Sequence, residues 1–149
     1  MRFTRRDFIQ KFVVFAGSLA LPKLSLANWF ADDFSHRSIN ATLAALFPEQ
    51  QIQSSRKIFL KLPRIAENGS VVPITITSSI KYIDTVYILS EKNPVPLIAK
   101  FSLAPNLDTF IGARFKMQET CNVIVVVKSG EQYYKTQQKV KVTLGGCGG

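Results

Sequence analysis

Histidine, cysteine and tryptophan are scarce in this sequence of 149 residues, which contains one His, two Cys and one Trp. One histidine is too few for most histidine metal cages, and two cysteines exclude a disulfide-rich scaffold and a Cys₄ zinc site. The chain also lacks the phosphate-binding loop, the zinc-protease motif and the nucleophile elbow. We therefore expect no cofactor, no bound metal and no catalytic residue of its own.

The formal net charge of +9 at first suggests a nucleic-acid partner. However, residues 1–27 contribute five basic residues and one acidic residue to that balance. The remaining basic residues are scattered rather than clustered, which favours a solvated surface over a phosphate-binding patch. We expect no nucleic-acid partner.

Residues 1–27 have the pattern of a bacterial export signal. Arg5 and Arg6 precede an apolar run from Phe12 to Leu21, and small residues precede a cut expected after Ala27. The arginine pair indicates the twin-arginine pathway, which exports folded proteins. The apolar run is too short to cross a hydrocarbon core of about 30 Å as a helix. The alternative to an export signal is a buried N-terminal helix of the fold. We expect a periplasmic protein with no stable membrane insertion, exported together with a folded partner.

A short helix should open the mature domain. The apolar spacing predicts it over residues 32–48, with Asp32, Asp33 or Ser35 as N-cap and Pro48 at its end.

Beyond residue 53 the apolar period changes from helical to alternating, which indicates short strands. The predicted strands lie at residues 58–62, 72–77, 83–89, 97–103, 110–117, 121–128, 132–135 and 139–144. Such strands, about ten residues apart, predict an all-β fold, an immunoglobulin-like antiparallel β-sandwich spanning residues 28–144. Pro73 has no N–H to donate, so its strand should be an edge or should bulge there.

Two predicted strands are apolar on both faces, as Phe59 beside Leu60 and Ile124 beside Val125 illustrate. A strand with two apolar faces needs cover on both sides. This pattern predicts a heterodimer buried through one sheet.

The last five residues hold one functional group, the Cys147 thiol. Gly145, Gly146, Gly148 and Gly149 surround it, and glycine is the most conformationally free residue. An extended chain spans about 3.3–3.6 Å per residue, so the thiol could reach about 10 Å beyond residue 144 into a narrow channel of another protein. This pattern predicts residues 145–149 to be a flexible swinging arm whose cysteine carries a covalent passenger.

Other uses of that thiol remain open at this stage. Cys147 could pair with Cys121, although Cys121 alternates with Val123 and Val125 and should face the core. It could also link two chains, which would make the protein a non-catalytic interaction module. A thiol oxidoreductase is less favoured, because the chain has no C-x-x-C motif.

The Gly-Gly-Cys-Gly-Gly terminus of a β-rich, exported chain resembles that of the SoxY family, sulfur-carrying subunits of the bacterial thiosulfate-oxidising (Sox) system. Four internal stretches are also similar: residues 62–69 (LPRIAENG), 71–74 (VVPI), 91–96 (EKNPVP) and 139–144 (KVKVTL). The chain departs from the family at residues 78–81 (SSIK), where a Ser-Pro pair is expected, and at Cys121, where a polar residue is more usual.

The resemblance implies an immunoglobulin-like sandwich that pairs with a small β-subunit, SoxZ. It implies that Cys147 carries sulfur intermediates and that the chain is a carrier, not an enzyme. The implied partners are a c-type cytochrome complex that loads thiosulfate and a metal-dependent hydrolase that releases sulfate.

Overall fold

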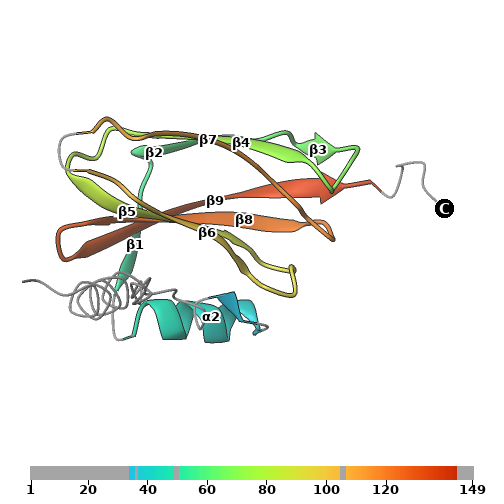
Figure 1. The fold of residues 1–149 in the computed structure, drawn as a ribbon, viewed down its shortest axis with the longest axis horizontal. Helices are drawn as coiled ribbons and strands as arrows, with labels where there is room; N and C mark the ends of the chain where they lie inside the picture. The colour runs from blue at the N-terminus through green and yellow to red at the C-terminus, as the bar shows by residue number, and fades with distance from the viewer. Residues whose placement is uncertain (1–33, 36, 49–50, 105–106, 144–149) are drawn as a thin grey trace, which may run out of the picture.

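The computed structural model describes residues 34–35, 37–48, 51–104 and 107–143, and strands dominate this part of the chain (Figure 1). One α-helix, α2, spans Ile39–Leu46. The strands are β1 (Ile52–Ser54), β2 (Ile58–Lys61), β3 (Ile65–Ala66), β4 (Val72–Ser78), β5 (Ile83–Ser90), β6 (Leu97–Ser102), β7 (Phe110–Phe115), β8 (Cys121–Ser129) and β9 (Gln132–Val142).

The strands form two sheets packed face to face, which confirms the predicted β-sandwich (Figure 1). The larger sheet has the order β1-β9-β8-β5-β6, with β3 also paired to β9, and the smaller sheet has the order β2-β4-β7. Neighbouring strands are antiparallel except at one edge, where β1 and β3 both run parallel to β9. The parallel pairs were not predicted. They arise because the chain leaves the larger sheet after β1, forms β2 in the smaller sheet, and returns to the same edge as β3.

The core between the sheets is built from the alternating residues of the long strands. Ile74 and Ile76 of β4 face Val123, Val125 and Val127 of β8 in one buried cluster. This arrangement is the predicted one, because successive strand residues point to opposite faces.

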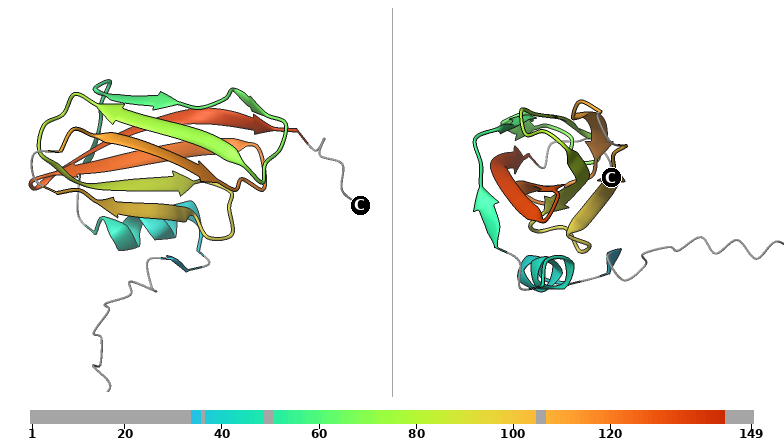
Figure 2. Two further views of the ribbon diagram at one scale, coloured as in Figure 1. Left: turned by 45° about the horizontal axis from the view of Figure 1, so that its top comes forward. Right: turned by 90° about the vertical axis from the view of Figure 1, so that its left-hand side faces the viewer.

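The other face of β8 is covered by the chain itself. Ile124 and Val126 belong to a second buried cluster, against which Leu43 of helix α2 packs. Phe47 follows the helix and meets the Tyr87 ring edge to face, with ring centroids 5.0 Å apart. Figure 2 shows the helix on the outer side of the larger sheet. Ile124 is therefore covered by the chain's own helix and gives no reason to expect a partner. The prediction that Ile124 needs cover from a heterodimer partner was wrong.

The helix is shorter than predicted. Ser38, rather than Asp32, Asp33 or Ser35, is its N-cap, because the Ser38 hydroxyl accepts a hydrogen bond from the Ala41 N–H at 3.2 Å. Within the described residues, no helix is long and apolar enough to span a membrane.

Pro73 lies in the central strand of the smaller sheet, not in an edge strand. The prediction failed because β2 is short: it pairs only with Thr75 to Ser78 of β4. At Pro73 the strand has one neighbour, Arg114 of β7, so the missing N–H is tolerated at a position that is locally an edge.

Candidate functional site

The predicted arm begins at one end of the sandwich. Strand β9 ends at Val142, and Thr143 is the last residue that the structure describes (Figure 1). Cys147 and its four flanking glycines lie outside the described residues, as do residues 1–27. The structure does show the segment that precedes residues 144–149. We call it the arm root, after the predicted arm, and define it as residues 142–143 with their bonded neighbours.

One edge of the arm root is held by the segment around β3. The Lys141 N–H donates to the Arg64 carbonyl at 3.0 Å, and the Thr143 N–H donates to the Ala66 carbonyl at 3.1 Å. Three residues before Lys141 in β9, the Gln138 side-chain amide donates to the Leu62 carbonyl at 3.1 Å. A two-residue strand thus fixes the end of β9.

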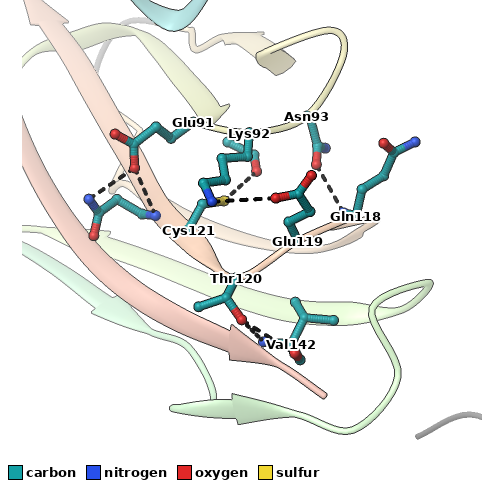
Figure 3. Close-up of polar contacts among 10 residues, drawn as sticks. Glu91, Lys92, Asn93, Gln118, Glu119, Thr120, Cys121 and Val142 are labelled. Carbon is teal, nitrogen blue, oxygen red and sulfur yellow. Dashed lines mark hydrogen bonds and ion pairs between the residues drawn. The ribbon is translucent and has the colours of Figure 1, made fainter. Parts of the chain in front are cut away.

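The opposite edge is held by one side chain. The Val142 N–H donates to the Thr120 Oγ1 at 2.9 Å, and that hydroxyl donates to the Val142 carbonyl at 3.3 Å (Figure 3). The last backbone pair between β8 and β9 is Cys121 with Val140. Thr120 therefore extends the ladder beyond the point where the backbone pairing stops. The chain is bonded on this side up to Val142 and on the β3 side up to Thr143.

Thr120 is positioned by the neighbouring loops. The Asn93 side chain donates to the Lys116 carbonyl at 2.7 Å. It also accepts from the Gln118 N–H at 3.1 Å (Figure 3). An ion pair between Lys92 and Glu119 at 3.3 Å joins the same loops, but both side chains are more than half exposed and the pair contributes little.

The neighbouring Glu91 adds two contacts to β8. Its carboxylate accepts from the Asn122 backbone at 3.3 Å and from the Asn122 side chain at 3.1 Å. Residues 91–93 thus fix the loop that carries Thr120.

Gly69 packs directly against the arm root. Its carbonyl accepts from the Met117 N–H at 2.7 Å. A Cβ at residue 69 would overlap the Met117 carbonyl oxygen and lie 2.9 Å from Cγ1 of Val142. Only glycine fits there without displacing the backbone of the loop.

The sequence stretches that carry the family resemblance therefore meet at this end of the sandwich. Residues 62–69 bond to β9, residues 91–96 fix the loop before β8, and residues 139–143 include the arm root. Val71 donates to the Asn68 carbonyl at 3.3 Å, and Val72 pairs with Phe115 immediately before that loop. Segments far apart in the sequence thus build one attachment point.

Cys121 faces the core, as predicted. It is 3% exposed and has a free thiol. Its Sγ lies 3.2 Å from the Oγ of Ser90, which is also buried. A thiol this inaccessible is a poor nucleophile for reagents in solution.

Basic side chains line a hollow beside β9. The hollow has a volume of about 660 Å³ and is lined by Arg64, Thr120, Gln138, Lys139 and Lys141. Within the described part of the chain, no group of three or more His, Cys, Asp or Glu residues could hold a metal ion.

The comparison with protein families decides the identity. Residues 43–147 match the model of the sulfur oxidation protein SoxY. The chain belongs to the SoxY family. The matched region includes Cys147 and covers the whole of the sandwich, as well as the arm root.

The structure of the sulfur carrier protein SoxY from Chlorobium limicola f. thiosulfatophilum is similar to this chain. The two are 36% identical with a TM-score of 0.65, over 72% of this chain and 97% of the Chlorobium protein. A chain from a structure of T cell activation by the bacterial superantigen toxic shock syndrome toxin-1 is 12% identical, over 58% of this chain and 99% of that one. The TM-score of that pair is 0.41. No curated protein matches this SoxY-family chain.

Proposed function

We propose that this SoxY-family protein is a periplasmic carrier that holds sulfur intermediates covalently on Cys147 during thiosulfate oxidation. The observation that carries the proposal is the arm root, which is bonded at both edges directly before the cysteine-bearing tail. The match to the SoxY model, which extends to residue 147, supports it. The burial of Cys121 supports it too, because Cys147 is the only other thiol of the chain.

The loading step forms a sulfur–sulfur bond between the Cys147 thiol and the terminal sulfur of thiosulfate. The thiol and S₂O₃²⁻ become a cysteine S-thiosulfonate, with one proton and two electrons released. The electrons pass to the c-type cytochrome complex that we propose as the loading partner. The sulfonate group then leaves as sulfate when a metal-dependent hydrolase adds water, and a persulfide and one proton result.

The carrier performs neither step alone. Residues 1–27 are cleaved as a twin-arginine signal, residues 28–144 form the carrier domain, and residues 145–149 form the arm. A SoxZ-like β-subunit is the proposed heterodimer partner. Export of a folded pair would explain why a protein with no cofactor motif carries a twin-arginine signal.

Intact mass measurement of the mature protein tests the carrier role. After incubation with thiosulfate and the cytochrome complex, we expect one thiosulfate-derived adduct per chain. Cys147→Ser should keep the fold and abolish the adduct, and the matched Cys121→Ser variant should keep it. Peptide mapping that located the adduct on Cys121 would refute the proposal. A mass shift that showed only disulfide-linked dimers of the chain would favour the interaction module instead.

A further inference from the structure

The hollow beside β9 is lined by cations and by no acid among the described residues. Arg64, directly before β3, and Lys139 and Lys141 of β9 all line it. In the described part of the chain, none of these three side chains takes part in an ion pair. We call it the basic hollow. Its charge favours an anionic ligand.

The fold brings the three cations together. Lys139 and Lys141 flank Val140, whose side chain is buried in the core, so strand alternation places both lysines on the outer face of the larger sheet, about 7 Å apart. Arg64 lies beside them because β3 pairs with the end of β9 (Figure 1) and the Arg64 carbonyl accepts from the Lys141 N–H at 3.0 Å. Like charges this close repel one another, and a bound anion relieves the repulsion.

The donors of the basic hollow suit an anion with several oxygens. The Gln138 side-chain amide donates one N–H to the Leu62 carbonyl at 3.1 Å, and because an amide nitrogen carries two hydrogens, the other is left for a ligand. The Arg64 guanidinium presents a planar fork of donors that matches two oxygens of one anion. A sulfonate group, with three oxygens and one negative charge, fits this set of donors.

A second hollow at the arm root has no such preference. Its lining contains one acid, Glu67, and one cation, Lys116, so its charges balance. The Glu91 carboxylate does not line the basic hollow either. It is bonded to Asn122, which is the cross-strand neighbour of Lys139. The excess of positive charge at this end of β9 is therefore confined to the basic hollow.

The chain beyond the arm root is long enough to bring Cys147 to the basic hollow. Lys141 and Lys139 lie two and four residues before Thr143, which corresponds to about 7 Å and about 14 Å back along the chain. Cys147 is the fourth residue after Thr143, so an extended chain holds its thiol within about 13–14 Å of that residue. This range includes Lys141 and extends to about the position of Lys139.

We propose that the basic hollow binds the sulfonate group of a thiosulfonate carried on Cys147, so that the loaded tail docks on its own sandwich. The inference rests on the proposed function, which supplies this group. Arg64, Lys139 and Lys141 are exposed, so they hold free thiosulfate only weakly. A tethered sulfonate binds intramolecularly, for which weak contacts are enough. A tail with a free thiol has no sulfonate, so the hollow distinguishes the loaded carrier from the unloaded one.

NMR spectroscopy of the isotope-labelled mature protein, alone and with its β-subunit, tests this docking. Tetrathionate loads Cys147 without a partner enzyme: the thiolate forms a sulfur–sulfur bond to it, and thiosulfate leaves with the electron pair of the bond that breaks. Intact mass confirms one adduct. Loading should shift the backbone resonances of Lys139 and Lys141 and the side-chain resonances of Arg64 and Gln138. It should also raise the heteronuclear NOE of the tail glycines.

A matched adduct and two matched variants serve as controls. Methyl methanethiosulfonate gives Cys147 a methyl disulfide without a sulfonate, and this adduct should leave the resonances of the hollow in place. Arg64→Gln/Lys141→Gln should abolish the shifts that loading causes in the rest of the hollow. Lys92→Gln/Lys116→Gln removes the same charge from the neighbouring loops and should keep them. All four side chains are exposed, so both variants should melt within about 2 °C of the wild type.

The outcomes separate this inference from the carrier proposal. Unchanged resonances of the hollow in the loaded wild type would overturn the docking, and equal shifts with the methyl disulfide would overturn the role of the sulfonate. Free thiosulfate, titrated into Cys147→Ser, should not saturate the hollow up to about 10 mM. Saturation below that concentration would show a site for the free anion and would overturn the tethered ligand. Failure of the cytochrome complex to load Cys147 would refute the carrier proposal alone, because tetrathionate loading needs no partner.

Discussion

Gly69 offers a direct test of how tightly the arm root is packed. A methyl group at residue 69 would overlap the Met117 carbonyl oxygen and press on Val142. The Met117 carbonyl belongs to a backbone that is itself bonded to Gly69, so it cannot move without breaking that hydrogen bond. Overpacking of this kind costs about 1–3 kcal/mol. We therefore expect Gly69→Ala to lower the melting temperature by about 3–15 °C for a domain of this size.

Gly112→Ala is the matched control. A Cβ at residue 112 meets nothing within 4 Å, and neither Gly69 nor Gly112 has a positive φ. The same methyl group there should leave stability unchanged or raise it by up to about 1 kcal/mol, because alanine restricts the unfolded chain. Gly69→Ala should thus lower the urea midpoint of unfolding. Gly112→Ala should leave that midpoint unchanged or raise it slightly.

The Gly69→Ala and Gly112→Ala variants can also be compared by the rate at which Cys147 is loaded. Displacement of Val142 changes the origin and direction of the tail, so Gly69→Ala should also slow loading of Cys147 by the cytochrome complex at temperatures where the fold is intact. A Gly69→Ala variant as stable as the wild type would refute the account of the packing at this position.

Two further predictions concern the arm and its root. Deletion of Gly145 and Gly146 shortens the reach of the thiol by about 7 Å; turnover with partner enzymes should fall strongly while the melting temperature stays constant, and replacement of both residues by proline should act in the same way. Normal turnover in either variant would contradict the swinging-arm mechanism. Thr120→Val keeps the shape of the side chain but removes both hydrogen bonds to Val142, so unfolding free energy in urea should fall by about 1–2 kcal/mol. Thr75→Val, on the outer face of the smaller sheet, is its control and should change stability by less than about 0.5 kcal/mol.

The long strands could be predicted from the sequence because each has a clear alternation of its own. Strands β4, β5 and β8 begin and end within two residues of their predicted limits. Strand β9 was divided in two because Thr136, Gln137 and Gln138 interrupt its alternation, yet its backbone pairs with β8 without a break from Gln132 to Val140. Strands β1 and β3 have three and two residues, too few for any period to appear. They form because β9 has a free edge, which is a property of the assembled sheet.

In the candidate site, too, some residues could be predicted from the sequence and others could not. The assignment of Cys147 and its glycines rests on the sequence alone and stays a prediction, because they lie outside the described residues. The direction of Cys121 could be predicted from its alternation with Val123. The roles of Thr120 and Gly69 could not be predicted. Asn68 and Gly69 signal a turn in the sequence, but the contact with Met117 depends on a loop almost 50 residues away. Such contacts depend on how the two sheets are stacked, and a local pattern does not contain that information.

The hydrogen bonds that hold Val142 on one side and Thr143 on the other also set the local concentration of the Cys147 thiol. Cys147 is the fourth residue after Thr143, so an extended chain would hold its thiol within about 13–14 Å of a fixed point. A hemisphere of that radius holds one thiol at an effective concentration on the order of 0.3 M. If the root frayed by two residues, the radius would rise to about 20 Å and the effective concentration would fall about threefold. Under the proposed carrier role, the bonds from Thr120 and Ala66 would therefore keep the Cys147 thiol concentrated at the entrance of the active site of a partner enzyme that the sandwich has reached.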